Sequence, residues 1–181
     1  MSTEYTIAAI PTLYRGRMYR SRLEARWAAF FDRLGWQHEY EPFDLGKWSP
    51  DFAITSPFDA LIEVKPITEP DPDLFERVQG AVDRGAVFVM GIAPVSRGKW
   101  VQLGWWAASY EPALVVWMAE PDQPVLTADI LSFTSDRKNW VTGTNGHGLV
   151  ETDWPHMLAY RDHALGLWAD ASNAVQWEPK P

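Results

Sequence analysis

The sequence of 181 residues contains no cysteine and only four histidines. The absence of cysteine excludes disulfides and cysteine-based zinc sites, and it is typical of a reducing compartment. The histidines, at positions 38, 147, 156 and 163, have no spacing that pairs two of them as metal ligands. No apolar run is long enough to span a bilayer, and the first residues lack the basic start and apolar stretch of a secretory signal. We therefore expect a cytoplasmic protein that does not associate with a membrane.

Basic residues are also scarce, because 16 Lys and Arg stand against 24 Asp and Glu, which gives a net charge of −8. This balance argues against a general nucleic-acid coat protein. The deficit is uneven, since residues 1–50 hold seven basic and six acidic residues whereas residues 101–181 hold four and ten. A local basic patch can still bind phosphates, with an affinity that depends strongly on salt. The acidic C-terminal third should repel DNA and suits contact with a protein partner.

The first regular element predicted is a helix over residues 21–34, which Gly35 ends. Its apolar residues recur at the spacing of one buried stripe. They are Leu23, Trp27, Phe30, Phe31 and Leu34.

The arginines near this helix do not form one patch. At about 100° per residue, Glu24 falls on one flank of the apolar stripe, with Arg20 one turn before it. Three arginines fall on the opposite flank, namely Arg22, Arg26 and Arg33. For these three we expect a solvated face. We therefore expect Arg15, Arg17 and Arg20 to meet the phosphates of DNA near Glu24.

Short apolar segments with turns between them follow the helix. The predicted strands cover residues 36–43, 51–54, 61–65 and 86–92. A turn at residues 44–47 joins the first two as a hairpin, and Pro66 ends the third. A helix from residue 70 to Gly85 precedes the fourth. Because a helix between two strands makes a crossover, the strands on either side of it are predicted to be parallel.

The chain is predicted to have three parts. They are an N-terminal arm of residues 1–14, an α/β core of residues 15–120, and an extension of residues 121–181 packed on the core. Further strands are expected at residues 99–106 and 113–119. Residues 136–149 are polar and glycine-rich, which predicts an exposed loop. A last helix is predicted to start at Asp153.

The third predicted strand carries the most informative residues. Because side chains alternate along a strand, Glu63 and Lys65 project from one face, while Ile62 and Val64 point into a core. Buried charges are costly without partners, and we expect Asp51 on the neighbouring strand to be one. Two carboxylates on neighbouring strands repel each other unless a cation lies between them. Oxygen ligands without Cys or His favour Mg²⁺ or Mn²⁺ over zinc.

Each of these residues also has a simpler interpretation. Glu63 and Lys65 can form a surface ion pair on an edge strand, and Asp51 can cap a turn. Trp105 and Trp106 can stack on bases, but in a chain with eleven tryptophans core packing is the stronger expectation.

Taken together, Pro50-Asp51 and Glu63-Val64-Lys65 resemble the signature of the PD-(D/E)XK nuclease superfamily. The order of a helix carrying Ser21-Arg22-Leu23-Glu24, three strands, a helix and a strand is similar to the core of that superfamily. The resemblance covers residues 15–92 and implies a restriction-endonuclease-like α/β fold, a mixed sheet flanked by helices. The fuller text, from Ser21 to Trp27 and from Tyr40-Glu41-Pro42 through Trp48-Ser49-Pro50-Asp51, looks like small phage and prophage nucleases. The S-x-L-E, PDF and EVKP blocks are also similar to those of the end-cleaving nuclease subunit of heteromeric transposons.

The resemblance implies catalytic roles for four residues, Glu24, Asp51, Glu63 and Lys65. Both strand carboxylates and the main-chain carbonyl of Val64 would be metal ligands, and Glu24 would bind metal directly, through water or at a second ion. Lys65 would orient or deprotonate the attacking water. Some exonuclease-like members carry a Gln with a Tyr four residues on, but here Gln79 is followed by Asp83. That difference argues against the exonuclease subclass.

Two main hypotheses follow. The first is an Mg²⁺- or Mn²⁺-dependent DNA endonuclease of a phage or other mobile element, acting in DNA processing, recombination or defence. The second is a nuclease fold kept as a DNA- or protein-binding module, with catalysis lost or dependent on a partner. A structural component of a phage particle is a weaker third idea. A homodimer is compatible with either main hypothesis.

Overall fold

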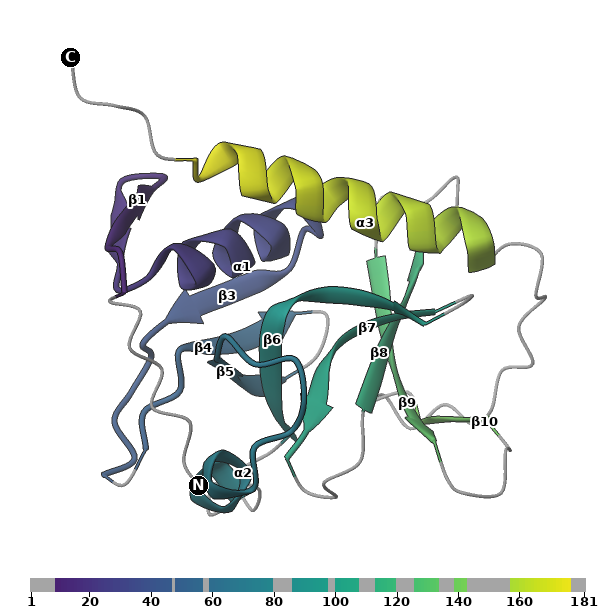
Figure 1. Ribbon diagram of the computed structural model, residues 1–181, viewed down its shortest axis with the longest axis horizontal. Helices are drawn as coiled ribbons and strands as arrows, with labels where there is room; N and C mark the ends of the chain where they lie inside the picture. The colour runs from purple at the N-terminus through teal and green to yellow at the C-terminus, as the bar shows by residue number, and fades with distance from the viewer. Residues whose placement is uncertain are drawn as a thin grey trace.

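The computed structural model of the protein describes residues 9–46, 48–56, 59–79, 86–97, 100–107, 113–119, 126–133, 139–142 and 157–176. Their backbone forms a five-stranded mixed sheet with helices on both faces (Figure 1). A three-stranded sheet contacts one edge of this sheet, and a two-stranded hairpin contacts the first helix. The α/β class predicted from the sequence is confirmed.

The five-stranded sheet is the scaffold of the molecule. Its strands, in spatial order, are β3 (Gln37–Tyr40), β4 (Phe52–Ser56), β5 (Ala60–Val64), β6 (Ala86–Arg97) and β7 (Trp100–Trp106). Neighbouring strands are antiparallel except β5 and β6, which are parallel. The connection between these two includes α2 (Pro72–Gln79), as a crossover requires. The predicted order of helix, three strands, helix and strand is therefore confirmed.

The first helix, α1 (Arg22–Arg33), lies across one face of the sheet. Ser21 caps it with extended backbone and a side-chain oxygen that accepts a main-chain N–H. Gly35 follows its C-terminal end at φ 70°, a conformation that glycine adopts readily. The indole N–H of Trp27 donates to the carbonyl of Gly91 at 2.9 Å and so ties α1 to β6.

The C-terminal helix α3 (Met157–Ala174) packs on α1, above the same face of the sheet (Figure 1). The ring of Trp168 lies 4.7 Å from that of Trp27 and 5.5 Å from that of Phe30. A C-terminal helix is confirmed, although its predicted start at Asp153 lies outside the described residues. Burial of these large rings on α1 fixes the helix over the sheet.

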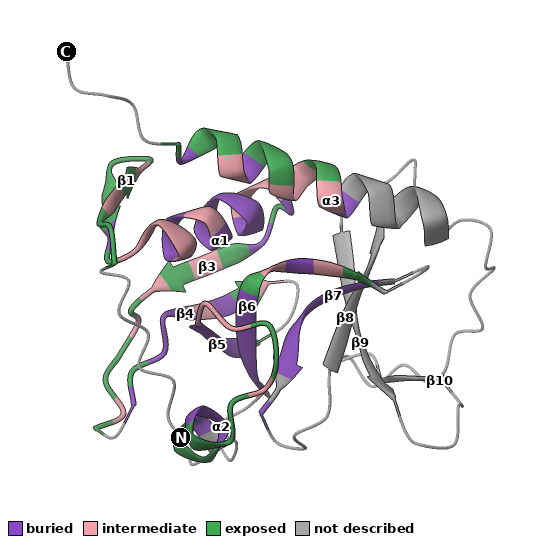
Figure 2. Ribbon diagram, in the orientation of Figure 1, coloured by how far each residue is buried: buried purple, intermediate pink, exposed green. Residues whose placement is uncertain are grey.

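The opposite face of the sheet is covered by α2, through Leu74, Phe75 and Val78. Trp105 is buried in this second core, as expected, whereas the side chain of Trp106 lies outside the described part of the chain. The sheet strands between the helices are largely buried (Figure 2). None of the described helices is both long and apolar enough to cross a membrane.

The remaining strands belong to two small sheets. They are β1 (Thr12–Tyr14) with β2 (Arg17–Tyr19), and β8 (Ala113–Ala119), β9 (Leu126–Phe133) and β10 (Asn139–Thr142). The predicted arm thus ends in a strand, because Arg15 and Gly16, both at positive φ, form the tight turn of a hairpin. The loop predicted at residues 136–149 is wrong for residues 139–142, where Trp140 and Val141 favour a strand. The boundary at residue 120 stays a prediction, and the strands on either side of it pair in one sheet.

Candidate metal and catalytic site

The most buried acid of the site, Asp51, lies directly before β4, and only 1% of its side chain is exposed. Pro50 precedes it and stiffens the entry to the strand. One carboxylate oxygen, Oδ2, accepts the main-chain N–H of Val64 at 2.8 Å. Since β4 and β5 pair with Phe52 opposite Ile62, the register itself brings Asp51 to the end of β5. The proline-aspartate pair and the end of β5 therefore meet in space, as the sequence predicted.

Glu63 and Lys65 lie on one face of β5 and its continuation, with their charged groups in contact. The ammonium Nζ of Lys65 lies 2.6 Å from Oε1 of Glu63 and 3.7 Å from Oδ2 of Asp51. It also donates to the carbonyl of Val64 at 3.2 Å. The second oxygen of Glu63, Oε2, accepts the indole N–H of Trp48 at 2.7 Å. Glu63 is buried, so the interpretation as a surface ion pair on an edge strand is wrong.

Glu24 lies in the first turn of α1, where a carboxylate is favoured by the helix dipole. Its main-chain N–H donates to the Ser21 hydroxyl at 3.1 Å, and that hydroxyl donates to Oε1 of Glu24 at 2.9 Å. The hydroxyl of Tyr40, at the end of β3, donates to Oε2 at 2.5 Å. Two hydroxyl groups, one at the start of α1 and one at the end of β3, thus hold the Glu24 carboxylate in one orientation.

Arg20 connects Glu24 to the strand carboxylates. Its Nη2 donates to Oδ1 of Asp51 at 2.5 Å, and its Nε lies 2.9 Å from Oε1 of Glu41 and 3.8 Å from Oε2 of Glu24. The Arg20 side chain is 58% exposed, unlike the carboxylate of Asp51 that it contacts. A partly exposed cation therefore neutralises a buried acid.

The electrostatics of the site follow from this burial. Burial, together with the charges of Glu63 and Glu24, raises the pKa of Asp51 to about 6, although Lys65 and the Val64 N–H oppose the shift. Burial would lower the pKa of Arg20, but Tyr40 and the surrounding carboxylates outweigh it and raise that pKa. Burial, and then the hydrogen bond to Glu24, raises the pKa of Tyr40. Burial is thus the main reason that the pKa of Asp51 is raised, and the neighbouring carboxylates add to it.

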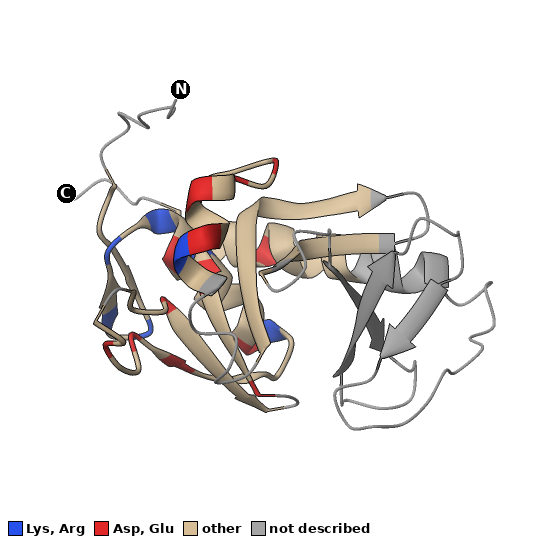
Figure 3. Cartoon of the chain, turned by 90° about the horizontal axis from the view of Figure 1, so that it is seen from below, with Lys and Arg blue, Asp and Glu red and all other residues tan. Residues whose placement is uncertain are grey.

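The three arginines expected to bind DNA do not lie together. Arg20 belongs to the carboxylate cluster. Arg15 lies at the other end of α1, where its Nη1 is 3.1 Å from Oδ2 of Asp32. Arg17 is exposed on β2. Figure 3 shows basic and acidic segments interspersed over the described part of the chain rather than one basic patch. DNA binding by these residues stays a prediction.

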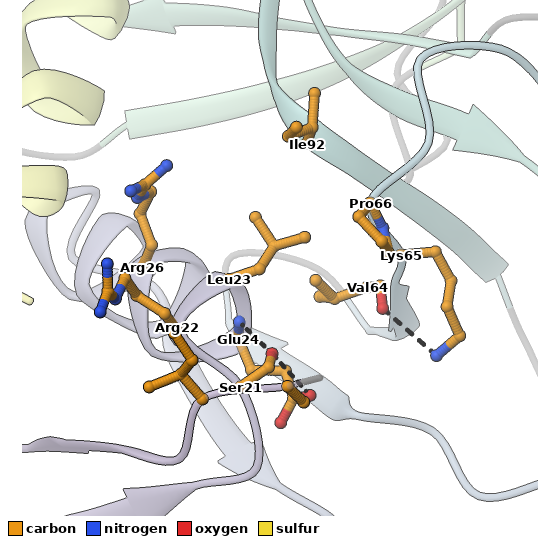
Figure 4. A pocket seen from close by; sticks show the side chains of 11 residues that line it. Ser21, Arg22, Leu23, Glu24, Arg26, Val64, Lys65, Pro66 and Ile92 are labelled. Carbon is orange, nitrogen blue, oxygen red and sulfur yellow. Dashed lines mark hydrogen bonds between the residues drawn. The ribbon is translucent and has the colours of Figure 1, made fainter. Parts of the chain in front are cut away.

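Arg22 and Arg26 correct the helical-wheel prediction. Both are half-buried, and they line a cavity of about 420 Å³ together with Glu24 and Lys65, instead of forming a solvated face. Figure 4 shows them on the α1 side, with Val64, Lys65 and Pro66 opposite and Leu23 between. The helical wheel considers α1 alone and so could not show the cavity that forms between α1 and the end of β5. It also could not include α3, which packs beside them.

Three further residues of the site were not expected from the sequence. Tyr40 donates a hydrogen bond to Glu24, and Trp48 donates one to Glu63. Glu41 forms an ion pair with Arg20. The signal for Trp48 was its position two residues before Pro50, but nothing in the pattern indicated which carboxylate its N–H would meet.

The donor set of the cluster fits a hard divalent cation. Asp51, Glu63 and the carbonyl of Val64 present oxygen atoms around one ammonium, and oxygen atoms are the ligands that such a cation prefers. Within the described stretches, no three His, Cys, Asp or Glu side chains stand in the arrangement of a ready-made metal site. A cation at this position would therefore require Arg20 or Lys65 to move.

The chain was also compared with known proteins. It matches no protein-family model, no curated protein and no solved structure.

Proposed function

We propose that the protein is a divalent-metal-dependent DNA endonuclease, which hydrolyses phosphodiester bonds in the DNA processing or recombination of a phage or other mobile element. The observation that carries the proposal is the meeting of Asp51 and Glu63 around the ammonium of Lys65, at the ends of two adjacent strands. The order of elements and the resemblance of residues 15–92 to the PD-(D/E)XK superfamily support it.

The residues of the cluster have distinct roles in this proposal. Asp51, Glu63 and the carbonyl of Val64 would hold Mg²⁺ or Mn²⁺, and Glu24 would support the cation directly or through water. Such a cation supplies polarisation of a phosphodiester oxygen and a more acidic water. Trp48 and the Val64 N–H fix the orientation of the two strand carboxylates, which is how outer partners tune a metal site.

Lys65 is the residue that acts on the attacking water. Its ammonium contacts the same oxygens that would hold the metal, so a bound cation would displace it to a position beside the metal, close to where the nucleophile must approach the phosphate. From there it orients the water and balances the negative charge that develops on the phosphorane-like transition state. Pro66 after it keeps its backbone extended, which holds the side chain on the Glu63 face.

The test is direct. Purified protein is incubated with supercoiled plasmid, linear and branched DNA, in Mg²⁺, Mn²⁺ or EDTA. We expect the circular plasmid to be nicked or linearised with either metal and to stay intact in EDTA. Asp51→Asn and Glu63→Gln serve as matched controls, since each removes one charge with almost no change of volume. A wild-type protein that cuts no substrate under any of these conditions would reject the proposal.

A second candidate function is a binding module with the nuclease fold, whose catalysis is lost or depends on a partner. The contacts of Arg20 and Lys65 with the carboxylates favour it, because protein cations already occupy positions next to Asp51 and Glu63. The acidic C-terminal third supports a protein partner. DNA binding without cleavage in the plasmid assay would favour this candidate.

A further inference from the structure

The cavity beside the carboxylate cluster combines charged groups with an apolar lining. Its volume of about 420 Å³ lies in the range of small-ligand pockets, about 300–1,000 Å³. Arg22, Glu24 and Arg26 line it from α1, and Lys65 borders it on the opposite side (Figure 4). Apart from Ser21, the rest of the lining is apolar, formed by Ala9, Ile10, Leu23, Val64, Pro66 and Ile92. An occupant must therefore combine an anionic group with a largely apolar or aromatic body.

The two arginines are unusual because they lack a counter-charge. They stand one helical turn apart, where like charges repel. Among the described residues neither forms an ion pair, whereas Arg15 and Arg20 both do. The Nε atoms of Arg22 and Arg26 are enclosed and have no hydrogen-bond partner there. Burial, and then the charge of Arg22, lowers the pKa of Arg26. An anion in the cavity would offset the charges of both arginines.

Arg26 is also held in place before any ligand arrives. Its guanidinium carbon lies 5.5 Å from the ring centre of Trp168, in a cation–π contact. Trp168 itself packs against Trp27 and Phe30 in the main core. The C-terminal helix thereby orients a basic residue at the cavity, so binding there requires little loss of side-chain freedom.

We infer that this cavity binds a nucleotide of the DNA strand next to the cleaved bond, with a backbone phosphate on Arg22 and Arg26 and the sugar or base against Leu23, Pro66 and Ile92. The inference rests on the proposed function, since Lys65 marks the position of the cleaved bond. A DNA strand fits because it carries phosphates at regular spacing with flat apolar bases attached. Guanidinium groups suit the geometry of phosphate oxygens.

The experiment measures binding in EDTA, so that it does not depend on cleavage. A fluorescent single-stranded oligonucleotide is titrated with wild-type protein, with Arg22→Gln/Arg26→Gln and with the control Arg33→Gln/Arg77→Gln. The control removes the same charge from α1 and α2 but lies away from the cavity. We expect the first variant to bind about tenfold or more weakly. Its salt slope should fall by about 0.7 for each lost phosphate contact, while the control stays near wild type.

Three further measurements make the result decisive. Thermal melts check that both double variants are folded, and Arg22→Lys/Arg26→Lys, which keeps the charge, should recover part of the affinity. Thymidine monophosphate should displace the oligonucleotide at lower concentration than inorganic phosphate does, because only the nucleotide can use the apolar lining.

Several outcomes would overturn the inference. One is an equal loss of oligonucleotide affinity in the control variant. Another is equal competition by inorganic phosphate and by thymidine monophosphate. A third is displacement by poly-glutamate as efficient as by DNA at equal charge, which would indicate an acidic protein partner. Binding that depends on Arg22 and Arg26 in a protein that never cuts DNA would keep this site and reject the nuclease. If the protein cleaves DNA but its oligonucleotide affinity does not depend on Arg22 or Arg26, the nuclease would be kept and this binding site rejected.

Discussion

The guanidinium of Arg20 donates to Oδ1 of Asp51 at 2.5 Å, so a side chain that is 58% exposed neutralises one that is 1% exposed. The two residues are far apart in sequence and come from the start of α1 and the start of β4. Such a pair is asymmetric, because the arginine borders solvent and the aspartate does not. The arginine is thus placed to leave whenever a stronger cation takes the carboxylate.

Replacing Arg20 by Gln should therefore strengthen divalent-metal binding. Wild-type protein must release the guanidinium before the cation can use Asp51, and the variant has nothing to release. We expect the dissociation constant for Mn²⁺, measured by calorimetric titration, to fall about threefold to tenfold, which corresponds to about 0.7–1.4 kcal/mol. In EDTA the same variant should be less stable by about 1–2 kcal/mol, since Asp51 loses a charged partner that is itself largely solvated.

Arg17→Gln is the control for this prediction, because Arg17 is exposed and forms no ion pair with a described residue. It changes the net charge equally and should leave Mn²⁺ affinity unaltered. If Arg20→Gln instead weakened Mn²⁺ binding, the arginine would support the metal site rather than compete with it.

The raised pKa of Asp51 predicts how stability depends on pH in the metal-free protein. Its folded pKa of about 6 exceeds the ordinary value of 3.8. A carboxyl with a raised folded pKa contributes stability that is fully present below pH 3.8 and is lost as pH rises through about 6. Full ionisation of Asp51 should lower the free energy of unfolding by about 3 kcal/mol, at about 1.36 kcal/mol for each unit of pKa difference.

Asp51→Asn isolates this contribution. Both proteins are unfolded with urea in EDTA between pH 4 and pH 8. The free energy of unfolding of the variant should rise relative to that of wild type from pH 4 to pH 6, and the difference should persist above pH 6. A difference between the two proteins that is flat with pH would mean that Arg20 and Lys65 already compensate the Asp51 charge completely.

Trp48 should matter through its indole N–H rather than its bulk. Trp48→Phe keeps a buried ring but leaves Oε2 of Glu63 without a donor. We expect a loss of about 1–3 kcal/mol in the free energy of unfolding and a metal affinity lowered by about tenfold to a hundredfold.

Trp105→Phe is the matched control, since Trp105 is buried in the same core. It should lose comparable stability but keep the affinity for Mn²⁺. Equal Mn²⁺ affinities in the two variants would mean that Trp48 contributes only to core packing and that its hydrogen bond to Glu63 does not affect metal binding.

The sequence predicted the scaffold well because its signals there are local and periodic. The apolar stripe of α1, the capping Ser21, the proline after β5 and the crossover helix each specify one element, and together they specify the topology. Strand alternation also placed Glu63 and Lys65 on one face.

What the sequence missed depends on contacts between distant segments. The position of Arg26 is decided by Trp168, from the other end of the chain, and no pattern around α1 carries that information. The pairing of Arg20 with Asp51 likewise depends on how closely α1 approaches the end of β4. The turn at Arg15 and Gly16 was missed for a different reason, since positive φ at an arginine has no clear sequence signal.

The last prediction separates a catalytic Lys65 from a structural one. In the proposed mechanism Lys65→Ala keeps the carboxylates and the carbonyl of Val64 and removes a competing cation, so Mn²⁺ binding should be kept or strengthened and DNA binding should stay nearly intact. The cleavage step should slow by about 10²–10⁴-fold, the usual cost of removing one positioned proton-transfer or charge-stabilising group. Single-turnover cleavage of the plasmid with excess enzyme measures that step.

If Lys65 only neutralises Glu63 and Asp51, the same substitution should lower thermal stability and leave turnover per folded molecule unchanged. Lys65→Arg distinguishes the two roles further, because it keeps the charge but is planar, larger and effectively never deprotonated. A structural cation would be replaced well by arginine, and the variant would cut normally. A water-orienting ammonium would not, because its contact at 2.6 Å with Glu63 leaves little room for the wider group. Normal cutting by Lys65→Ala would contradict the mechanism and favour the binding module.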